Sequence, residues 1–268
     1  MKQFKTFMIT FTVAFCIMLM AYTGLYWFMQ YSSPQAVGEA QQGVPVLSLT
    51  PDDTKTVLAV MDGSDARFYF LVQLNAIQGT VNVVSVPGSF YLSVPQRTLN
   101  ESMDYAGVRQ CVQDLSRQFD IAVDYYLVGD ETALGNLAET FAPLDTESVT
   151  LPQSVKQYLL KGSRYVDVNT LAAAVAFSPS LLDNGVGIDF MNTVADKLLQ
   201  DNLHKLKDDV PQNIKDNFAQ LDTDLGTQQL EQLKRIVRLL EKGAVQHGRL
   251  VLTQTDTAQA EIDRILKE

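Results

Sequence analysis

Two carboxylates that lie close together in the chain are the first candidates for chemistry. Asp62 and Asp65 directly follow a short apolar run, and Arg67 comes two residues after the second of them. The two carboxylates could bind a cation between them, and a guanidinium can bind phosphate oxygens. The simpler interpretation is a turn whose carboxylates are solvated or cap the backbone, and the sequence favours it.

Three further arginines could bind phosphate. Arg164 precedes a short β-rich segment, whereas Arg109 and Arg117 lie in a helical pattern. The apolar spacing puts the latter two on the polar face of that helix, where solvation is the simpler expectation. Arg164 is therefore the better candidate for a ligand-binding cation.

The composition excludes several classes of protein. The 268 residues correspond to one or two domains, and 46% hydrophobic against 19% charged residues excludes a disordered chain. A net charge of -10 argues against nucleic-acid binding, which needs clustered Lys and Arg. Cys16 and Cys111 are too few for a disulfide framework or a cysteine-built zinc site. His204, expected to be exposed, and His247, expected in a turn, leave little for histidine-based catalysis.

The N-terminus predicts a membrane anchor. Lys2 and Lys5 precede an uncharged run over residues 7–29, which would span roughly 35 Å as a helix and cross a bilayer. The lysines put residues 1–6 in the cytoplasm and the rest of the chain outside the cell membrane, as a single-pass protein. A cleaved signal peptide is the alternative, although its apolar core would be shorter. The Pro-containing stretch over residues 30–53 is expected to be a linker.

Residues 54–268 are expected to form one α/β (α+β) domain, with a central mixed β-sheet flanked by helices. Strands predicted at residues 56–61, 67–75, 80–86 and 125–128 should share this sheet. The short link with Gly79 should make the second and third of them an antiparallel hairpin. Weaker or later strands are predicted at residues 149–151, 164–166 and 249–253. Apolar periodicity predicts helices at residues 104–119, 131–141, 169–177, 188–206, 211–221, 226–240 and 256–266.

The order of these segments resembles the LytR–CpsA–Psr family. The matching stretches are residues 57–62 (VLAVMD), 70–87, 98–106 with 119–128 (FDIAVDYYLV), and 221–233. Each is unspecific alone, but their order and spacing after an N-terminal anchor resemble the family over residues 54–252. The resemblance implies a bacterial, membrane-anchored, extracytoplasmic domain. Members of the family transfer glycopolymers from a polyprenyl-pyrophosphate carrier to peptidoglycan, and the resemblance makes Mg²⁺ a possible cofactor.

The residues that would carry this chemistry are mostly replaced. Pyrophosphate transfer needs Arg forks and a carboxylate-held metal ion to neutralise phosphate oxygens. After the family-like segment over residues 85–87, the positions of the family's Arg and Asp hold Gly88 and Ser89. The other altered positions are Ser64, Arg67, residues 176–178 and residues 184–192. The sequence therefore predicts that transferase activity is absent.

Three functions remain open on the sequence. The favoured one is a catalytically degenerate envelope protein that binds a polyprenyl (pyro)phosphate lipid or an envelope protein, with Gly88, Ser89 and Arg164 as ligand-binding candidates. The second is an active transferase that uses Arg67 and Arg164 with Asp62 or Asp65. The third is a purely structural envelope module. The apolar residues near 171–177 and 190–198 could wall a lipid tunnel, but a packed core is the simpler expectation.

Overall fold

The computed structural model of the chain describes residues 49–63, 67–130, 133, 136–137, 140–141, 143–159, 164–167, 170–171, 186–254 and 257–267. All of them lie in one unit, which extends from Ser48 to Glu268. The predicted anchor over residues 7–29 and Asp65 lie outside the described residues, as do most of the linker and of the helices predicted over 131–141 and 169–177. Within the described part of the chain, no helix combines the length and the hydropathy needed to cross a membrane.

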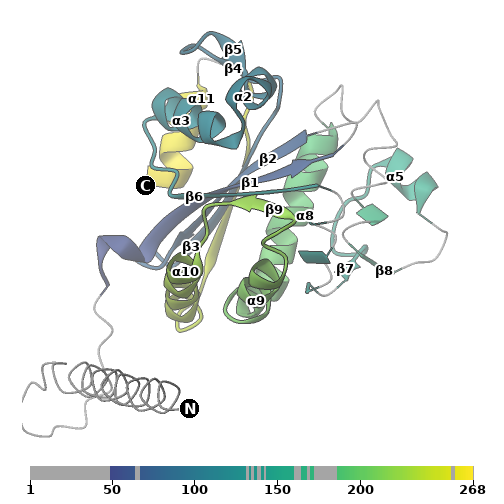
Figure 1. Ribbon diagram of the computed structural model, residues 1–268. Coiled ribbons are helices and arrows are strands. Elements are labelled where there is room, and N and C mark those ends of the chain that lie inside the picture. Colours follow the sequence, from purple (N-terminus) through teal and green to yellow (C-terminus); the bar gives the residue numbers. More distant parts are fainter. Residues whose placement is uncertain are drawn as a thin grey trace, which may run out of the picture. The chain divides into compact units, whose positions relative to one another are not determined.

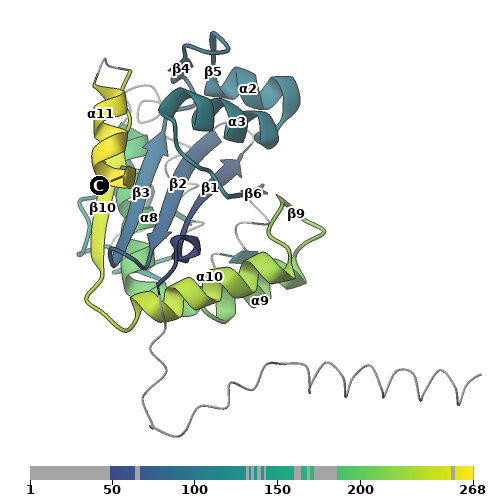
Figure 2. The ribbon, with the colours of Figure 1, turned by 90° about the vertical axis from the view of Figure 1, so that its left-hand side faces the viewer.

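The central sheet has six strands in the order β10-β3-β2-β1-β6-β9, and β3, β2 and β1 are seen side by side in Figure 2. They are β1 (Thr54–Asp62), β2 (Arg67–Asn75), β3 (Thr80–Val86), β6 (Tyr125–Gly129), β9 (Leu221–Thr223) and β10 (Gln246–Val251). β2 pairs antiparallel with both β1 and β3, whereas β1–β6 and β3–β10 are parallel pairs. The predicted mixed sheet is confirmed, together with the antiparallel hairpin, whose Gly79 has a φ of 69°.

Helices α2 (Leu99–Ala106), α3 (Val108–Phe119) and α11 (Ala258–Ile262) cover one face of the sheet, which we call the α2 face (Figure 1). Alternate strand residues, among them Leu58, Leu71 and Val84, are fully buried in one core with these helices. This follows from the strand geometry, because every second side chain points to the same face. The π-helical η3 (Asp263–Lys267) continues α11 along β3 and β10.

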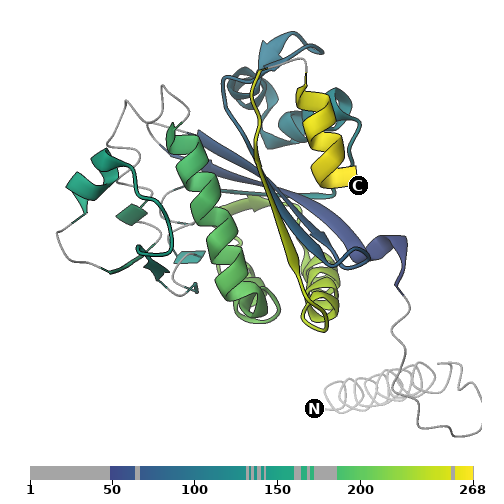
Figure 3. The same ribbon diagram turned by 180° about the vertical axis from the view of Figure 1, so that it is seen from behind.

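Helices α8 (Val186–Asn202), α9 (Asp209–Asp216) and α10 (Thr227–Leu240) cover the opposite face, which we call the α8 face (Figure 3). The apolar side of α8 packs against Phe68 of β2, and its buried residues are Phe190, Met191, Val194 and Leu198. Beyond α8 lie a small sheet and α5 (Gln153–Tyr158). The small sheet pairs β7 (Leu144–Asp145) with β8 (Tyr165–Val166). Residues 190–198 are thus part of a packed core.

The helix predicted over residues 104–119 is in fact two helices. α2 begins at Leu99 because Thr98 and Glu101 form a capping box, in which each side chain accepts a hydrogen bond from the other's backbone N–H. Gly107, with a φ of 72°, ends α2 and precedes α3. The apolar spacing alone could not reveal this break, because both helices bury residues with the same periodicity.

Smaller differences affect other boundaries. Residues 149–151 do not form the predicted strand, and the late strand begins at Gln246 rather than at residue 249. The helix predicted to run to residue 221 ends at Asp216, after which the chain enters the sheet as β9. The remaining elements of the described residues are η1 (Pro51–Asp53), β4 (Tyr91–Leu92), β5 (Arg97–Thr98) and η2 (Leu203–Leu206).

Candidate functional site

The end of β1 and the start of β2 bring Asp62 and Arg67 together on the α2 face. The antiparallel register pairs the two residues, and Arg67 Nε donates a 2.6 Å hydrogen bond to Asp62 Oδ1. Arg67 Nη1 donates a second bond, of 2.5 Å, to Oδ1 of Asp104 on α2. The guanidinium therefore lies between two carboxylates, and we call these three residues the Arg67 cluster.

The electrostatics of the Arg67 cluster stabilise the charged guanidinium. The hydrogen bond to Asp62, and then that to Asp104, raise the pKa of Arg67 above its usual range. Because arginine is charged at any physiological pH, the main consequence is that its donors are occupied. The side chains of Arg67 and Asp62 are 27% and 34% exposed, so water still reaches them. A phosphate group would have to displace at least one carboxylate in order to bind the guanidinium bidentately.

The turn that carries Gly88 and Ser89 lies against the start of α2. The carbonyl of Gly88 accepts a 2.9 Å hydrogen bond from the backbone N–H of Asn100. A Cβ atom built on Gly88 would lie only 2.3 Å from Oδ1 of Asn100. That oxygen also accepts a 2.9 Å bond from the buried hydroxyl of Tyr69, whose pKa is raised by burial. The Asn100 amide thus fills the space that a side chain at position 88 would need, while Ser89 is exposed.

Among the described residues, the carboxylate predicted to bind the Mg²⁺ ion that the family resemblance implies already binds a cation of the protein. Asp62 is one of its two predicted ligands, and its carboxylate already binds the guanidinium of Arg67 at 2.6 Å. Asp65, the other, lies outside the described residues. Over the part of the chain that is described, no group of three or more His, Cys, Asp or Glu side chains is placed to hold a metal. The cation between Asp62 and Asp104 is therefore supplied by the protein itself.

Arg164 belongs to a different region of the molecule. It lies next to β8 in the small sheet beyond α8, where its Nη2 is 2.9 Å from Asp145 Oδ2 and 3.5 Å from Glu147 Oε2. The hydrogen bond from Arg164 lowers the pKa of Asp145. Its guanidinium also lies 5.4 Å from the ring centre of Tyr165. The structure therefore places Arg164 in its own ion pair and does not bring it into the Arg67 cluster.

Three residues of the site were missed by the sequence interpretation, namely Tyr69, Asn100 and Asp104. The signal for the last two was present, because residues four apart on a helix share one face. That face could be assigned to the site only once α2 was known to begin at Leu99. Tyr69 looked like an ordinary aromatic strand residue, and nothing in the sequence distinguishes its hydroxyl.

The remaining candidates lie apart from this cluster. Arg109 Nε contacts the hydroxyl of Tyr126 at 3.3 Å, and Arg117 is exposed on α3. His204 is exposed, as expected. His247 was wrongly expected in a turn, because it lies in β10 with Nδ1 3.3 Å from Asp196 Oδ1 of α8. None of these four is part of the Arg67 cluster.

No protein-family model and no curated protein matches the sequence. Solved structures do match. A protein of Eubacterium siraeum has a TM-score of 0.65 and 13% identity, over 86% of this chain and 98% of its own. TagT of B. subtilis has a TM-score of 0.53 and 21% identity, over 78% of this chain and 82% of its own. TagT bound to LIIa-WTA has a TM-score of 0.57 and 17% identity, over 85% of this chain and 98% of its own.

These comparisons confirm the predicted resemblance at the level of the fold. TagT is an enzyme of the LytR–CpsA–Psr family. The matches cover most of both chains, whereas the identities are low, so what is shared is the arrangement of the sheet and its helices. The chain has a LytR–CpsA–Psr-like fold.

Proposed function

We propose that the chain is a membrane-anchored extracytoplasmic protein of the bacterial cell envelope that binds its ligand without transferring it. The ligand would be a polyprenyl (pyro)phosphate lipid or an envelope protein. The fold supports the envelope assignment, since TagT, which shares it, has been solved with LIIa-WTA bound. The residues of the site support the absence of transfer.

The observation that carries the proposal is the state of Arg67. A transferase must hold cations ready for the negative charge that develops on phosphate oxygens. Here the Arg67 guanidinium binds Asp62 and Asp104. The position of the family's turn arginine holds Gly88, and the Asn100 amide fills the space beside it. Removing one preorganised stabilising group costs about 10²–10³-fold in rate, so two such changes argue for negligible turnover.

The proposal is tested with the full chain in detergent or in lipid nanodiscs. We expect no transferase or pyrophosphatase turnover of a polyprenyl-pyrophosphate substrate, with or without Mg²⁺. Mass spectrometry of lipids extracted from the purified protein should identify a polyprenyl phosphate, or affinity isolation should recover an envelope protein. The exposed Arg117→Ala variant serves as the matched control for Arg67→Ala. Turnover that is abolished in Asp62→Ala or Arg67→Ala, but not in the control, would establish an active transferase instead.

The proposed anchor has its own test. Protease added to intact cells should digest the chain beyond residue 31, while a tag at the N-terminus stays protected. This follows from the uncharged run over residues 7–29 and from the lysines that precede it. Recovery of a soluble product without residues 1–30 would show a cleaved signal peptide.

A further inference from the structure

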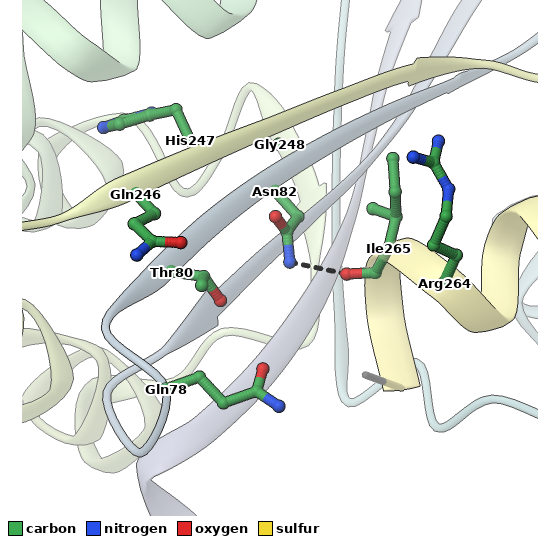
Figure 4. Close-up of a pocket in the computed structure, with 8 residues that line it drawn as sticks. All are labelled: Gln78, Thr80, Asn82, Gln246, His247, Gly248, Arg264 and Ile265. Carbon is green, nitrogen blue, oxygen red and sulfur yellow. Dashed lines mark hydrogen bonds between the residues drawn. The ribbon is translucent and has the colours of Figure 1, made fainter.

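A second site lies at the other end of the α2 face. A cavity of about 330 Å³ lies between the start of β3, the start of β10 and η3, and Figure 4 shows the residues that line it. The parallel register pairs Gln246 with Thr80 and Gly248 with Asn82, so these side chains share that face. The cavity is lined by Gln78, Thr80, Asn82, Gln246, His247, Gly248, Arg264 and Ile265.

Two side chains of β3 present polar atoms that the described residues leave unused. Oγ1 of Thr80 is buried and has no hydrogen-bond partner among them. Asn82 Nδ2 donates one hydrogen bond to Gln73 Oε1 at 3.0 Å and another to the Ile265 carbonyl at 2.7 Å. The second bond is drawn in Figure 4. Its Oδ1 accepts no hydrogen bond from any described residue. A ligand hydroxyl suits both atoms, because it donates and accepts.

Glycine at position 248 keeps the Asn82 oxygen in place. A Cβ atom built on Gly248 would lie 2.3 Å from Oδ1 of Asn82. Since the Asn82 amide is held by two hydrogen bonds, it could not turn away without breaking them. The small residue on the edge strand β10 therefore preserves the polar lining of the cavity.

The charge of the lining favours an anion. Arg264 is exposed, and no carboxylate of the described residues pairs with it. The adjacent Asp263 binds Lys267 at 2.9 Å instead. His247 contributes to the lining, but its ring points away from Asn82 in Figure 4, toward Asp196 on the α8 face. The cavity thus has one cationic side chain and no acidic one, in a chain whose net charge is -10.

We infer that this cavity is a binding site for a small hydroxylated anion, that is, a sugar acid or a polyol phosphate. Ligand hydroxyls would bond Thr80 Oγ1 and Asn82 Oδ1, and the anionic group would bind Arg264. A volume of about 330 Å³ is at the small end for ligand pockets, which fits a single ring or a short polyol. The site is separate from the Arg67 cluster and does not depend on the proposed function.

Calorimetry on the full chain in detergent tests this inference. Glucuronate and glycerol 3-phosphate are the probes, glucose and glycerol are their neutral counterparts, and inorganic phosphate is the anion without hydroxyls on carbon. We expect at least one probe to bind, and the neutral compounds and phosphate to bind about tenfold more weakly. Which probe binds distinguishes a carboxylate from a phosphate ester. Absence of binding by both probes, or equal binding of inorganic phosphate, would overturn the inference.

Variants locate the binding site. Arg264→Gln should weaken binding of the probe about tenfold or more, whereas Arg117→Gln, at an exposed arginine on α3, should not change it. Thr80→Val keeps the shape of the side chain but removes its hydroxyl. It should weaken binding of the probe more than it weakens binding of inorganic phosphate. Gly248→Ala should also weaken binding, because it displaces Asn82. Unchanged affinity in correctly folded Arg264→Gln and Thr80→Val proteins would refute the site. These experiments measure neither turnover nor bound lipid, so their outcome is independent of the outcome for the proposed function.

Discussion

The two ends of the α2 face use polar residues in opposite ways. At one end, the Arg67 cluster joins charged groups that are still partly exposed to water. At the other end, neutral amides are buried, and Gln73 and Asn82 donate to the carbonyls of Leu266 and Ile265 in η3. The first arrangement occupies an arginine, whereas the second one fixes the C-terminal helix to the sheet.

The two ends differ in their contribution to stability and in whether a cationic side chain remains free to bind a ligand. Partly exposed ion pairs contribute little to stability, because water and salt screen them. Buried hydrogen bonds contribute modestly when they are made, but breaking one leaves a buried group without a partner. In the Arg67 cluster the guanidinium is therefore occupied by carboxylates, although these ion pairs add little to the free energy of unfolding. The end with the buried amides of Gln73 and Asn82, which we call the amide end, contributes more to the stability of the fold. The nearby Arg264 has no carboxylate partner among the described residues.

The largest expected effect tests whether the core between the two ends is sealed. Cys111 of α3 is fully buried in that core, and burial raises the pKa of its thiol to about 12. At pH 8 its alkylation should be on the order of a thousandfold slower in the folded protein than in urea, because only the thiolate reacts. The unfolded thiol loses its proton first as pH rises from about 9 to about 12, so the free energy of unfolding should fall over that range.

The measurement is a time course of iodoacetamide labelling at Cys111 by mass spectrometry. Cys16 of the predicted anchor is replaced by Ser, so that one thiol is followed. Labelling in the folded protein at the rate seen in urea would mean that the core is open, and the two ends could then not be treated as independent.

The next effect concerns the amide end. Asn82→Ala removes the donor to both Gln73 Oε1 and the Ile265 carbonyl. We expect a loss of about 2–3 kcal/mol in the free energy of unfolding, because buried acceptors are left without partners. Hydrogen exchange should also rise over α11 and η3, while α8 on the opposite face should be unaffected. Urea denaturation and exchange mass spectrometry measure the two quantities.

Gln246→Ala is the matched control, because its exposed amide lines the same cavity on the neighbouring strand. It should change the free energy of unfolding by no more than about 0.5 kcal/mol. Equal losses for the two variants would mean that the buried amides do not hold the C-terminal helix, and the contrast between the two ends would disappear.

A third experiment asks whether the turn at Gly88 can be restored. Gly88→Arg alone should destabilise the protein by about 1–3 kcal/mol, because its Cβ would meet the Asn100 amide at 2.3 Å. Combining it with Asn100→Ala should recover part of this loss, since the obstructing amide is gone.

Adding Ser89→Asp completes the family-like turn, and only the combined variant should bind inorganic pyrophosphate more tightly than the unmodified chain. Thermal denaturation and calorimetry measure both effects, and equal stability of the single and the double variant would contradict the packing argument.

The strands were largely predictable from the sequence, because their apolar content and the Gly79 turn are local signals. Arg67–Asn75 and Thr80–Val86 form the expected hairpin with the predicted bounds. The break at Gly107, whose φ is 72°, was missed because the apolar spacing continues through it, although glycine is a common residue at the end of a helix. By contrast, β10 joins the sheet in parallel beside β3, a contact between distant parts of the chain that no local pattern contains.

The candidate site was only half predictable. Asp62 and Arg67 were selected as a pair because they are close in the sequence, and they do meet. Their third partner, Asp104, comes from a helix 37 residues away in the chain, and the sequence could not place it. Arg164 was grouped with them on chemistry alone, yet it is held by Asp145 in the small sheet. Spacing finds neighbours along the chain, whereas the helix that completes a site is set by tertiary packing.

The smallest expected effect concerns the Arg67 cluster itself. Arg67→Met keeps much of the side-chain length but removes the cation from Asp62 and Asp104. Because all three side chains are partly exposed, we expect a loss of about 1 kcal/mol or less, shrinking further as salt is added. Urea denaturation at low and high ionic strength measures it, with Arg117→Met as the control for removing an exposed arginine. A loss above about 2 kcal/mol that salt does not reduce would show that the cluster is a structural ion pair. Its arginine would then hold the fold together, and the contrast between the two ends would have to be abandoned.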